Sequence, residues 1–169
     1  MPDDGDAGWI STACNDPQIA RFVVAVPSSY TEADARWFLE HAKSERESGT
    51  EAVFVIADAA DSEALGLVEL HVAAHDPDLA GIGYWLRAES RGCGAATLAV
   101  QLVAHWAFDD LGVQRLQLTT SPDNAASQRV AERAGFTREG LLRRWTATKN
   151  GRRDSVMFSI LPSDLEDAV

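Results

Sequence analysis

Blocks of apolar and polar positions with distinct periods predict the elements in the first half of the chain. Residues 7–15 have the composition of a short helix, which the turn residues Asn15-Asp16-Pro17 are expected to close. A capping box at Thr31 opens a second helix that should end near Gly49. A β-branched and aromatic run at 53–56 and an apolar run at 65–72 flank a polar turn. These two runs are predicted to form a β-hairpin.

A third strand, a long helix and a fourth strand are predicted for the middle of the chain. The strand covers residues 81–86 after a loop at 75–78, and the helix covers residues 94–111 before the stop signal Gly112. Residues 115–120 are the next strand. The long helix is expected to bury one apolar stripe, which consists of Leu98, Leu102, Val103 and Trp106.

The C-terminal part is predicted to be a helix followed by a hairpin. The helix covers residues 124–134, and Gly135 stands where a left-handed C-cap is needed. Residues 141–148 and 155–161 pair around Asn150-Gly151, the dipeptide that type I′ turns favour. The order of helices and strands predicts an α+β fold, and with no internal repeat or linker the 169 residues are read as a single domain.

Composition restricts the partners of this domain. The chain has fifteen Lys and Arg and 26 Asp and Glu, which give a net charge of -11. This charge argues against a nucleic-acid partner and suits a cationic or amine partner. The open alternative is that the acidic residues only aid solubility. Cys14 and Cys93 lack metal-ligand spacing, and we predict no metal. No apolar run approaches the roughly 18 residues of a membrane span, and the N-terminus lacks a signal-peptide pattern, so a cytoplasmic location is expected.

The most informative segment is the junction between the third strand and the long helix. Arg91-Gly92-Cys93-Gly94-Ala95-Ala96 leads directly into this helix, whose first amides have no intrahelical partner and can bind a diphosphate. A tight turn without a ligand is the plain alternative. A P-loop would need a lysine before Thr97, and a dinucleotide site would need an acidic residue at the end of the next strand. Neither is present, so both rivals are disfavoured.

Several segments taken in order resemble the GNAT N-acetyltransferase superfamily, with the RimJ/RimL-type branch as the nearest pattern. They are Gly83-Tyr84-Trp85-Leu86, the segment 91–96, Asn124-Ala125-Ala126-Ser127, Val130, Gly135-Phe136 and Glu139-Gly140. The resemblance covers about residues 7–162. It implies a three-layer fold with helices on both faces of a mixed, mostly antiparallel sheet whose middle strands splay apart. It also implies acetyl-CoA as the acyl donor.

The resemblance also implies which residues bind the donor. Arg91, Gly94 and Ala96 match the family's pyrophosphate loop, while Asn124 and Ser127 match positions that contact the pantetheine arm and the thiol. The plain alternative is that Asn124 is only a helix N-cap and Ser127 only a polar residue in the first turn. The full predicted set is Tyr84, Trp85, Leu86, Arg91, Gly92, Cys93, Gly94, Ala95, Ala96, Thr97, Asn124 and Ser127.

The sequence departs from the family pattern in two places. Many members have a tyrosine as the acid for the departing thiolate where this chain has Ala131, and Ser127 is the predicted substitute. Members also begin with a strand, whereas few residues precede position 7 here; either a lost edge strand or a start site assigned too late would explain this. A missing first strand would leave a sheet edge for a partner subunit, which suggests a homodimer.

Acyl transfer to an amine needs a base, an oxyanion site and an acid. Glu69 and His71 share one face of their strand, since side chains alternate. Glu69 is the first candidate for the base, with an ordinary polar-face residue as the alternative, and His71 could share the task. A backbone N–H near Tyr84 to Leu86 is expected to meet the oxyanion. Tyr84 and Trp85 point to opposite faces of their strand, so one should line the acceptor pocket and the other should pack in the core. The sequence leaves open which residue does which.

The predicted activity is therefore transfer of an acetyl group from acetyl-CoA to a primary amine, either a protein N-terminal α-amine or a small molecule. The rival hypothesis is an acyl-CoA sensor or interaction module that kept the fold and lost transfer. It is motivated by Ala131 and by the absent first strand.

Overall fold

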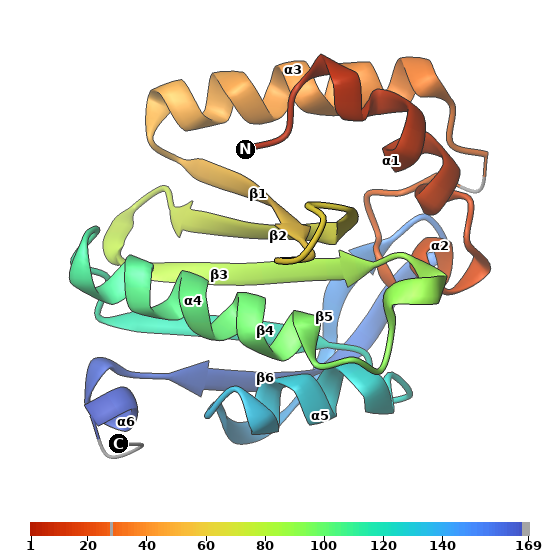
Figure 1. The fold of residues 1–169 in the computed structure, drawn as a ribbon. Helices are drawn as coiled ribbons and strands as arrows, with labels where there is room; N and C mark the ends of the chain where they lie inside the picture. Colours follow the sequence, from red (N-terminus) through yellow and green to blue (C-terminus); the bar gives the residue numbers. More distant parts are fainter. Residues whose placement is uncertain (28, 167–169) are drawn as a thin grey trace.

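The computed structural model describes residues 1–27 and 29–166, which form a six-stranded sheet between helices (Figure 1). The strand order is β1-β2-β3-β4-β6-β5, and every neighbouring pair is antiparallel except β3 and β4. The helices are α1 (Ala7–Cys14), α2 (Pro17–Phe22), α3 (Glu32–Ser48), α4 (Ala95–Asp109), α5 (Ala125–Arg133) and α6 (Pro162–Glu166), with 3-10 turns at Asp4–Asp6 and Ala88–Ser90. The strands are β1 (Glu51–Ala57), β2 (Ala64–Ala73), β3 (Asp76–Leu86), β4 (Arg115–Thr120), β5 (Thr137–Thr148) and β6 (Gly151–Ile160).

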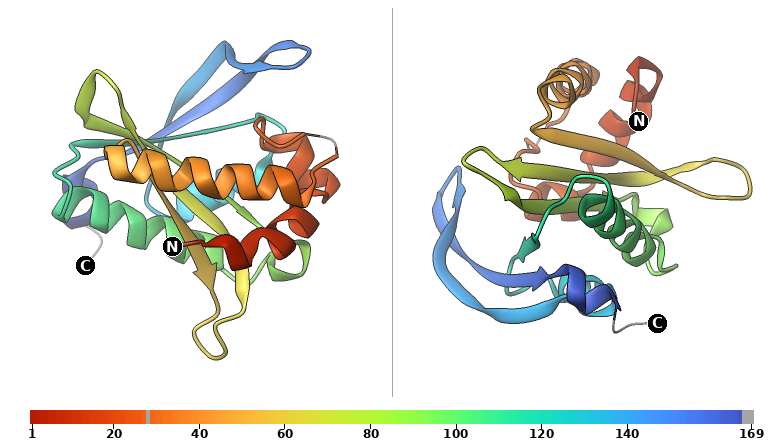
Figure 2. Two further views of the ribbon diagram at one scale, coloured as in Figure 1. Left: turned by 90° about the horizontal axis from the view of Figure 1, so that it is seen from above. Right: turned by 90° about the vertical axis from the view of Figure 1, so that its left-hand side faces the viewer.

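Two hydrophobic cores hold the helices to opposite faces of the sheet. On one face α1, α2 and α3 pack over Val53 and Leu67, and on the other α4 and α5 pack over Val68, Leu70 and strands β4 and β6. Figure 2 shows these layers from the side and shows the β5–β6 hairpin extending past the body. The alternation predicted for β2 is confirmed, since its successive side chains enter different cores.

The middle of the sheet opens where the two parallel strands diverge. Register between β3 and β4 runs over only three pairs, from Leu79 opposite Arg115 to Gly81 opposite Gln117. The rest of β3, up to Leu86, continues pairing with β2 but has no recorded partner in β4. The splayed middle strands and the predicted fold class are therefore confirmed.

Most predicted elements form close to their expected positions. The capping box at Thr31 forms, with its side chain accepting from the Asp34 N–H, and Gly49 ends α3 in a left-handed conformation. The β1–β2 hairpin and the strand β4 are also present. Ahead of α3, the described residues contain helices and no strand.

Three local predictions are wrong. The loop expected at 75–78 is a tight turn, and β3 already begins at Asp76, because its backbone continues the ladder with β2. A type I′ turn does not form at Asn150-Gly151: Thr148 pairs with Gly151, and within this turn only Gly151 has a positive φ, of 118°. The segment at Pro17, expected as a turn, is the N-terminus of α2, which Asp16 caps.

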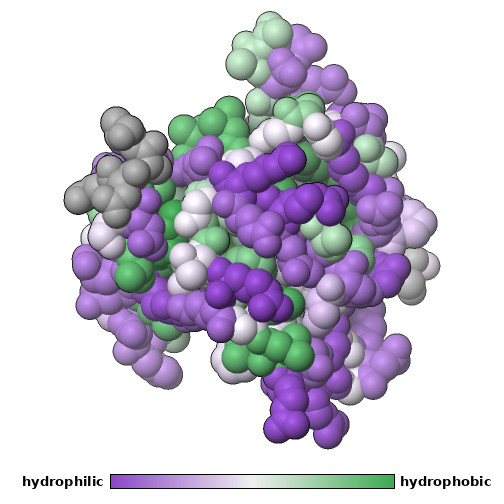
Figure 3. Space-filling view, turned by 90° about the horizontal axis from the view of Figure 1, so that it is seen from below, coloured by the Kyte–Doolittle hydropathy of each residue, from purple (hydrophilic) through white to green (hydrophobic). Residues whose placement is uncertain are grey.

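The apolar stripe predicted for α4 is only partly right. Leu98 and Leu102 are 58% and 61% exposed, whereas the buried face of the helix uses small residues. Those residues are Ala96, Ala99, Val100, Val103, Ala104 and Ala107. Close approach of α4 to the sheet requires small side chains, so the longer leucines turn outward. Figure 3 shows hydrophobic surface interrupted by hydrophilic side chains on the lower side of the molecule.

None of the helices in the described part of the chain combines the length and the apolar character that crossing a bilayer would require.

Candidate active site

The N-terminus of α4 presents main-chain amides at the edge of the opening in the sheet. Gly92 and Gly94 have φ of 82° and 91°, a left-handed conformation that turns the chain sharply into the helix. No side chain caps this end of the helix. Apart from their chain neighbours, no atom lies within 4 Å of the position that a Cβ would take at Gly92 or Gly94, so the space beside both glycines is open. An uncapped 15-residue helix with open space before it is suited to binding an anion.

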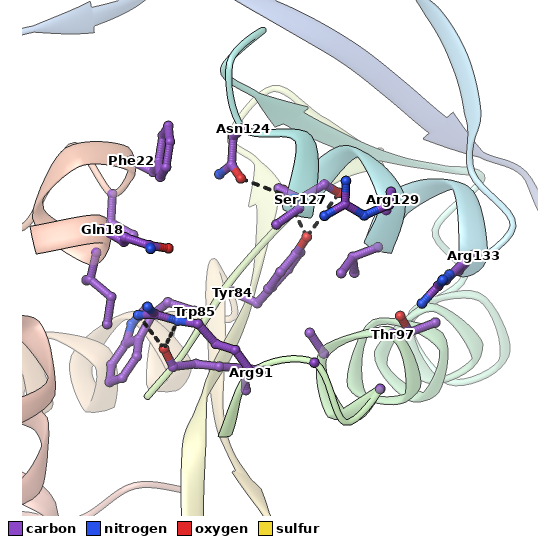
Figure 4. Close-up of a pocket in the computed structure, with 18 residues that line it drawn as sticks. Gln18, Phe22, Tyr84, Trp85, Arg91, Thr97, Asn124, Ser127, Arg129 and Arg133 are labelled. Carbon is purple, nitrogen blue, oxygen red and sulfur yellow. Dashed lines mark hydrogen bonds between the residues drawn. The ribbon is translucent and has the colours of Figure 1, made fainter. Parts of the chain in front are cut away.

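A cavity of about 250 Å³ lies in front of these amides. Its walls come from α2, from the end of β3, from the loop before α4 and from α5 (Figure 4). Gln18 and Phe22 project from α2 on one side, while Arg129 and Arg133 extend from α5 on the other. Two guanidinium groups beside uncapped amides make this cavity electropositive, although the chain as a whole is acidic.

A hydrogen-bonded pair of hydroxyl groups stands at the inner end of this cavity. The Tyr84 hydroxyl lies 2.9 Å from Ser127 Oγ and 3.3 Å from the Ser127 carbonyl oxygen. Asn124 caps α5, with its Oδ1 accepting from the Ser127 N–H at 3.1 Å, which fixes the serine in place. Burial raises the pKa of Tyr84 to about 12, so the phenol keeps its proton at neutral pH.

A second cavity of about 210 Å³ lies beyond this pair. It shares Tyr84, Asn124 and Ser127 with the first cavity, as well as Phe22 and Val23 of α2. Its other walls include a carboxylate, a guanidinium and several hydroxyl groups; among them are Glu69, Arg153, Thr119, Thr120, Ser121, Thr146 and Ser155. The two cavities therefore meet at the Tyr84–Ser127 pair, with an electropositive side and a side that contains Glu69.

Glu69 belongs to a chain of three ionisable groups on β1 and β2. His71 Nε2 lies 3.5 Å from Glu69 Oε2, and His71 Nδ1 lies 3.4 Å from Glu51 Oε2. Hydrogen bonding to Glu51, and then to Glu69, raises the pKa of His71 to about 10, while Glu51 has a lowered pKa. At neutral pH His71 is thus an imidazolium that cannot accept a proton, which favours Glu69 over His71 as the base. One ligand atom from each of the three lies within 4.8 Å of the others, and the absence of a metal stays a prediction.

Arg91 is held by the protein before any ligand arrives. Its Nη2 lies 2.9 Å from Asp16 Oδ1, and Nε and Nη2 both donate to the carbonyl oxygen of Leu86. The side chain therefore ties the loop before α4 to the N-cap of α2. Its predicted contact with a diphosphate would have to come from the remaining N–H groups, because these bonds already use part of the guanidinium.

Comparison with known proteins decides the family. A family model described as the acetyltransferase (GNAT) domain matches residues 1–137. The chain belongs to the GNAT acetyltransferase family. The predicted superfamily is thereby confirmed, and with it the assignment as an N-acetyltransferase that uses acetyl-CoA.

Relatives and solved structures agree with this membership. YjcK of Bacillus subtilis, named as a probable N-acetyltransferase, is 33% identical over 138 residues, which are 81% of this chain and 76% of the relative. The ribosomal-protein-serine acetyltransferase of Escherichia coli is 26% identical over 135 residues, 80% and 69% of the two chains. The structure of Mycobacterium smegmatis RimJ in complex with CoA-disulfide has a TM-score of 0.86 at 23% identity, with 97% and 81% covered. The resemblance to the RimJ/RimL-type branch is confirmed.

Most residues predicted to bind the donor border the first cavity of this GNAT protein. Those that do are Tyr84, Trp85, Leu86, Arg91, Gly92, Gly94, Ala96, Thr97, Asn124 and Ser127. Cys93 and Ala95 are not among its lining residues, and the Cys93 thiol instead donates to the Ser90 carbonyl oxygen at 3.1 Å. Trp85 is the core residue of the aromatic pair, packed 5.8 Å from the Trp9 ring, and Tyr84 lines both cavities.

Sequence reasoning missed two groups of lining residues in this GNAT protein. Gln18, Ile19, Phe22 and Val23 were missed because α2 was not expected, although Asp16-Pro17 is an N-cap followed by proline at the first helical position. Arg129 and Arg133 lie four residues apart on α5, and this spacing places both on one helical face. Ala131, where the family acid was expected, is fully buried and does not border either cavity.

Proposed function

We propose that this GNAT protein transfers the acetyl group of acetyl-CoA directly to a primary amine, with both substrates bound at once. The observation that carries the proposal is the meeting of two cavities at Tyr84 and Ser127. The first cavity, with uncapped amides and two arginines, takes the donor. The second cavity, with Glu69, takes the acceptor.

The residues around the first cavity fit a diphosphate followed by an extended arm. The amides at the start of α4 are uncapped, and the glycine loop leaves space before them. Arg129 and Arg133 add cations for further phosphate oxygens. The part of β3 beyond Gly81, which has no recorded partner in β4, supports an arm that pairs like an added strand.

Bound acetyl-CoA supplies an activated thioester carbonyl. The acceptor must reach it as a neutral amine, and Glu69 accepts the amine's proton through a water molecule. A main-chain N–H on the open edge of β3, between Tyr84 and Leu86, donates to the carbonyl oxygen as negative charge develops there.

Tyr84 and Ser127 assist the departing sulfur. When the Tyr84 hydroxyl donates to Ser127 Oγ, the Ser127 O–H is left to donate elsewhere, since a hydroxyl group has a single hydrogen. We assign this O–H to the sulfur, where its hydrogen bond stabilises the leaving thiolate; as Ser127 passes its proton to the sulfur it takes one from water, and Glu69 returns the amine's proton to solvent. Ser127 would thus replace the acid that the family pattern places at Ala131.

For the acceptor we propose a protein N-terminal α-amine or a small-molecule amine. The similarity to the ribosomal-protein-serine acetyltransferase of Escherichia coli supports the first, and the modest size of the second cavity, about 210 Å³, accommodates either. A cytoplasmic location and a homodimer formed across the edge strand β1 belong to the same proposal.

Release of free thiol from acetyl-CoA over a panel of amines tests the proposal, with the acetylated products identified by mass spectrometry. Glu69→Gln should lower the rate at neutral pH by roughly 100-fold or more and leave the affinity for CoA unchanged. Glu47→Gln is the matched control, because it removes the same charge at an exposed position of α3 away from the site. It should leave the rate and the affinity for CoA unchanged.

Two outcomes would contradict the proposal. Equal rates for Glu69→Gln and the parent chain across pH 6–9 would remove Glu69 from the mechanism. Binding of CoA without thiol release on any amine would favour the acyl-CoA sensor.

A further inference from the structure

Arg153 brings a positive charge to the second cavity from an unexpected position. It lies on β6 opposite Thr146 of β5, and its guanidinium extends to the C-terminus of α2. There Nη1 donates to the carbonyl oxygen of Arg21 at 3.1 Å and Nη2 to that of Phe22 at 2.8 Å. These contacts hold the guanidinium at the wall of the cavity that also contains Glu69.

The hydrogen-bonding capacity of this guanidinium is not fully used. A guanidinium has five N–H groups, and two of them bind the carbonyl oxygens. The Nε atom is buried without a hydrogen-bond partner, the only such side-chain atom recorded for the described residues. A buried donor that lacks a partner is destabilising, and Nε is shielded from the cavity, so a ligand would bind the Nη1 and Nη2 hydrogens that the two carbonyl oxygens leave free.

No carboxylate in the described part of the chain neutralises Arg153. The recorded ion pairs involve five other arginines and His71. Glu69, the carboxylate in the same cavity, is already paired with His71. A cation that is partly removed from water and has no counter-ion attracts an anion strongly.

The surroundings of Arg153 suit an anion as well. The Thr146 and Ser155 hydroxyl groups border the same cavity and lie 2.6 Å from one another, so one of their two hydrogens remains free to donate. Hydroxyl and guanidinium donors together are the usual partners of carboxylate and phosphate oxygens. The second cavity therefore has an acceptor for a proton, at Glu69, and a group of donors for an anion, around Arg153.

We infer that the amine acceptor carries an anionic group, a carboxylate or a phosphate, which binds Arg153 while the amine faces Glu69. The inference rests on the proposed function and specifies its substrate class. It differs from the cationic acceptor that the net charge of -11 suggests, because the charge at Arg153 is local and partly desolvated. A polyamine, which has no anion, would leave Arg153 unpaired.

Calorimetric titration of the CoA-bound protein with matched acceptors tests the inference without requiring turnover. Alanine, Ala-Gly and Ala-Gly-Gly are each titrated as the free acid and as the amide, and phosphoethanolamine is compared with ethanolamine. At least one anionic form should bind about tenfold or more tightly than its neutral partner. Preference for the peptide acids or for the phosphate ester identifies the anion. Equal affinities of charged and neutral forms across the whole series would overturn the inference.

Variants separate ligand binding from a purely structural role of Arg153. Arg153→Gln should reduce the affinity of the anionic form to that of the neutral form, and Arg153→Lys should retain part of the preference. Arg152→Gln is the matched control, because Arg152 is exposed and binds the carbonyl oxygens of Arg144 and Trp145 instead. Equal weakening of both forms by Arg153→Gln would assign the arginine to holding α2 and overturn the inference.

The acceptor titrations and the thiol-release assay together distinguish this inference from the proposed function. If the anionic preference is present and depends on Arg153 while no acceptor releases thiol, the transfer reaction is wrong and the anion site stands. If amines are acetylated with no preference for anionic forms, transfer stands and the anion site is wrong.

Discussion

Gly94→Val is the most direct test of the donor site, because the glycine lies where the loop becomes α4. Its φ is 91°, a region that a β-branched residue strongly disfavours, so the loop must either strain or change shape. The added side chain would also extend into space that is empty of protein atoms within 4 Å of the Cβ position. That space is where the proposal puts the diphosphate.

The expected magnitudes follow from these two effects. Left-handed strain destabilises the fold by roughly 1–2 kcal/mol or more for a non-glycine residue. Disturbing one amide-to-phosphate hydrogen bond removes about 1.5–3 kcal/mol of binding free energy, as for bonds to charged groups. The dissociation constant for CoA should therefore rise between about tenfold and about 100-fold.

Gly112→Val is the matched control, since it produces the same kind of strain at the other end of the same helix. Gly112 has a φ of 71° and nothing within 4 Å of its Cβ position, and it follows α4. Fifteen residues of helix separate it from the site by about 22 Å. Urea unfolding should show similar losses of stability for both variants, and calorimetry should show weaker CoA binding for Gly94→Val alone.

Two results would refute the reasoning about the loop. If Gly94→Val binds CoA as tightly as the parent chain, the diphosphate does not lie against this turn. If Gly112→Val weakens CoA binding to the same degree, the effect comes from the stability of α4 and carries no information about the site.

Two further variants test the acid and the ion pairs. Ser127→Ala should lower kcat by roughly 100-fold while CoA affinity stays the same, because it removes the O–H assigned to the sulfur and not the amides of α4; an unchanged kcat in the thiol assay would reject that role. His71→Gln should destabilise the fold most below pH 6.5, where both folded and unfolded chains protonate the histidine, and the deficit should shrink as pH rises towards about 10, the raised pKa of His71. Urea unfolding at pH 6, 8 and 10 measures the difference in the free energy of unfolding between the parent chain and His71→Gln. A difference that grows with pH would contradict the assigned pairing of His71 with Glu51 and Glu69.

The elements that sequence alone predicted well are those in which local chemistry and the tertiary structure agree. Thr31 and Asp34 form a capping box from side chains three residues apart, so neighbours along the chain suffice to define it. The turn into α4 was predictable for the same reason, since Gly92 and Gly94 each mark a positive φ. The cavity that we propose for the donor is built largely from segments with such local signals.

The cavity that we propose for the acceptor was less predictable because it depends on contacts between distant segments. Arg153 reaches the carbonyl oxygens of Arg21 and Phe22 across more than 130 positions of sequence, and no local pattern encodes that approach. The long leucines of α4 show the same limit. A helical period identifies an apolar face, but only packing decides that small residues face the sheet and that Leu98 and Leu102 do not.

The opening in the sheet explains how both sides of the site come to share one centre. Beyond Gly81 the strand β3 leaves β4 but stays paired with β2, which places Gly83 directly opposite Glu69. A Cβ at Gly83 would lie 3.3 Å from Glu69 Cγ and Oε1, closer than side chains normally pack, so glycine leaves the carboxylate room beside the cavity. The next residue, Tyr84, then reaches Ser127 on α5. Divergence of the two strands thus leaves Glu69 and the Tyr84–Ser127 pair on the walls of one cavity, the arrangement that the proposed attack and departure on a single carbonyl require.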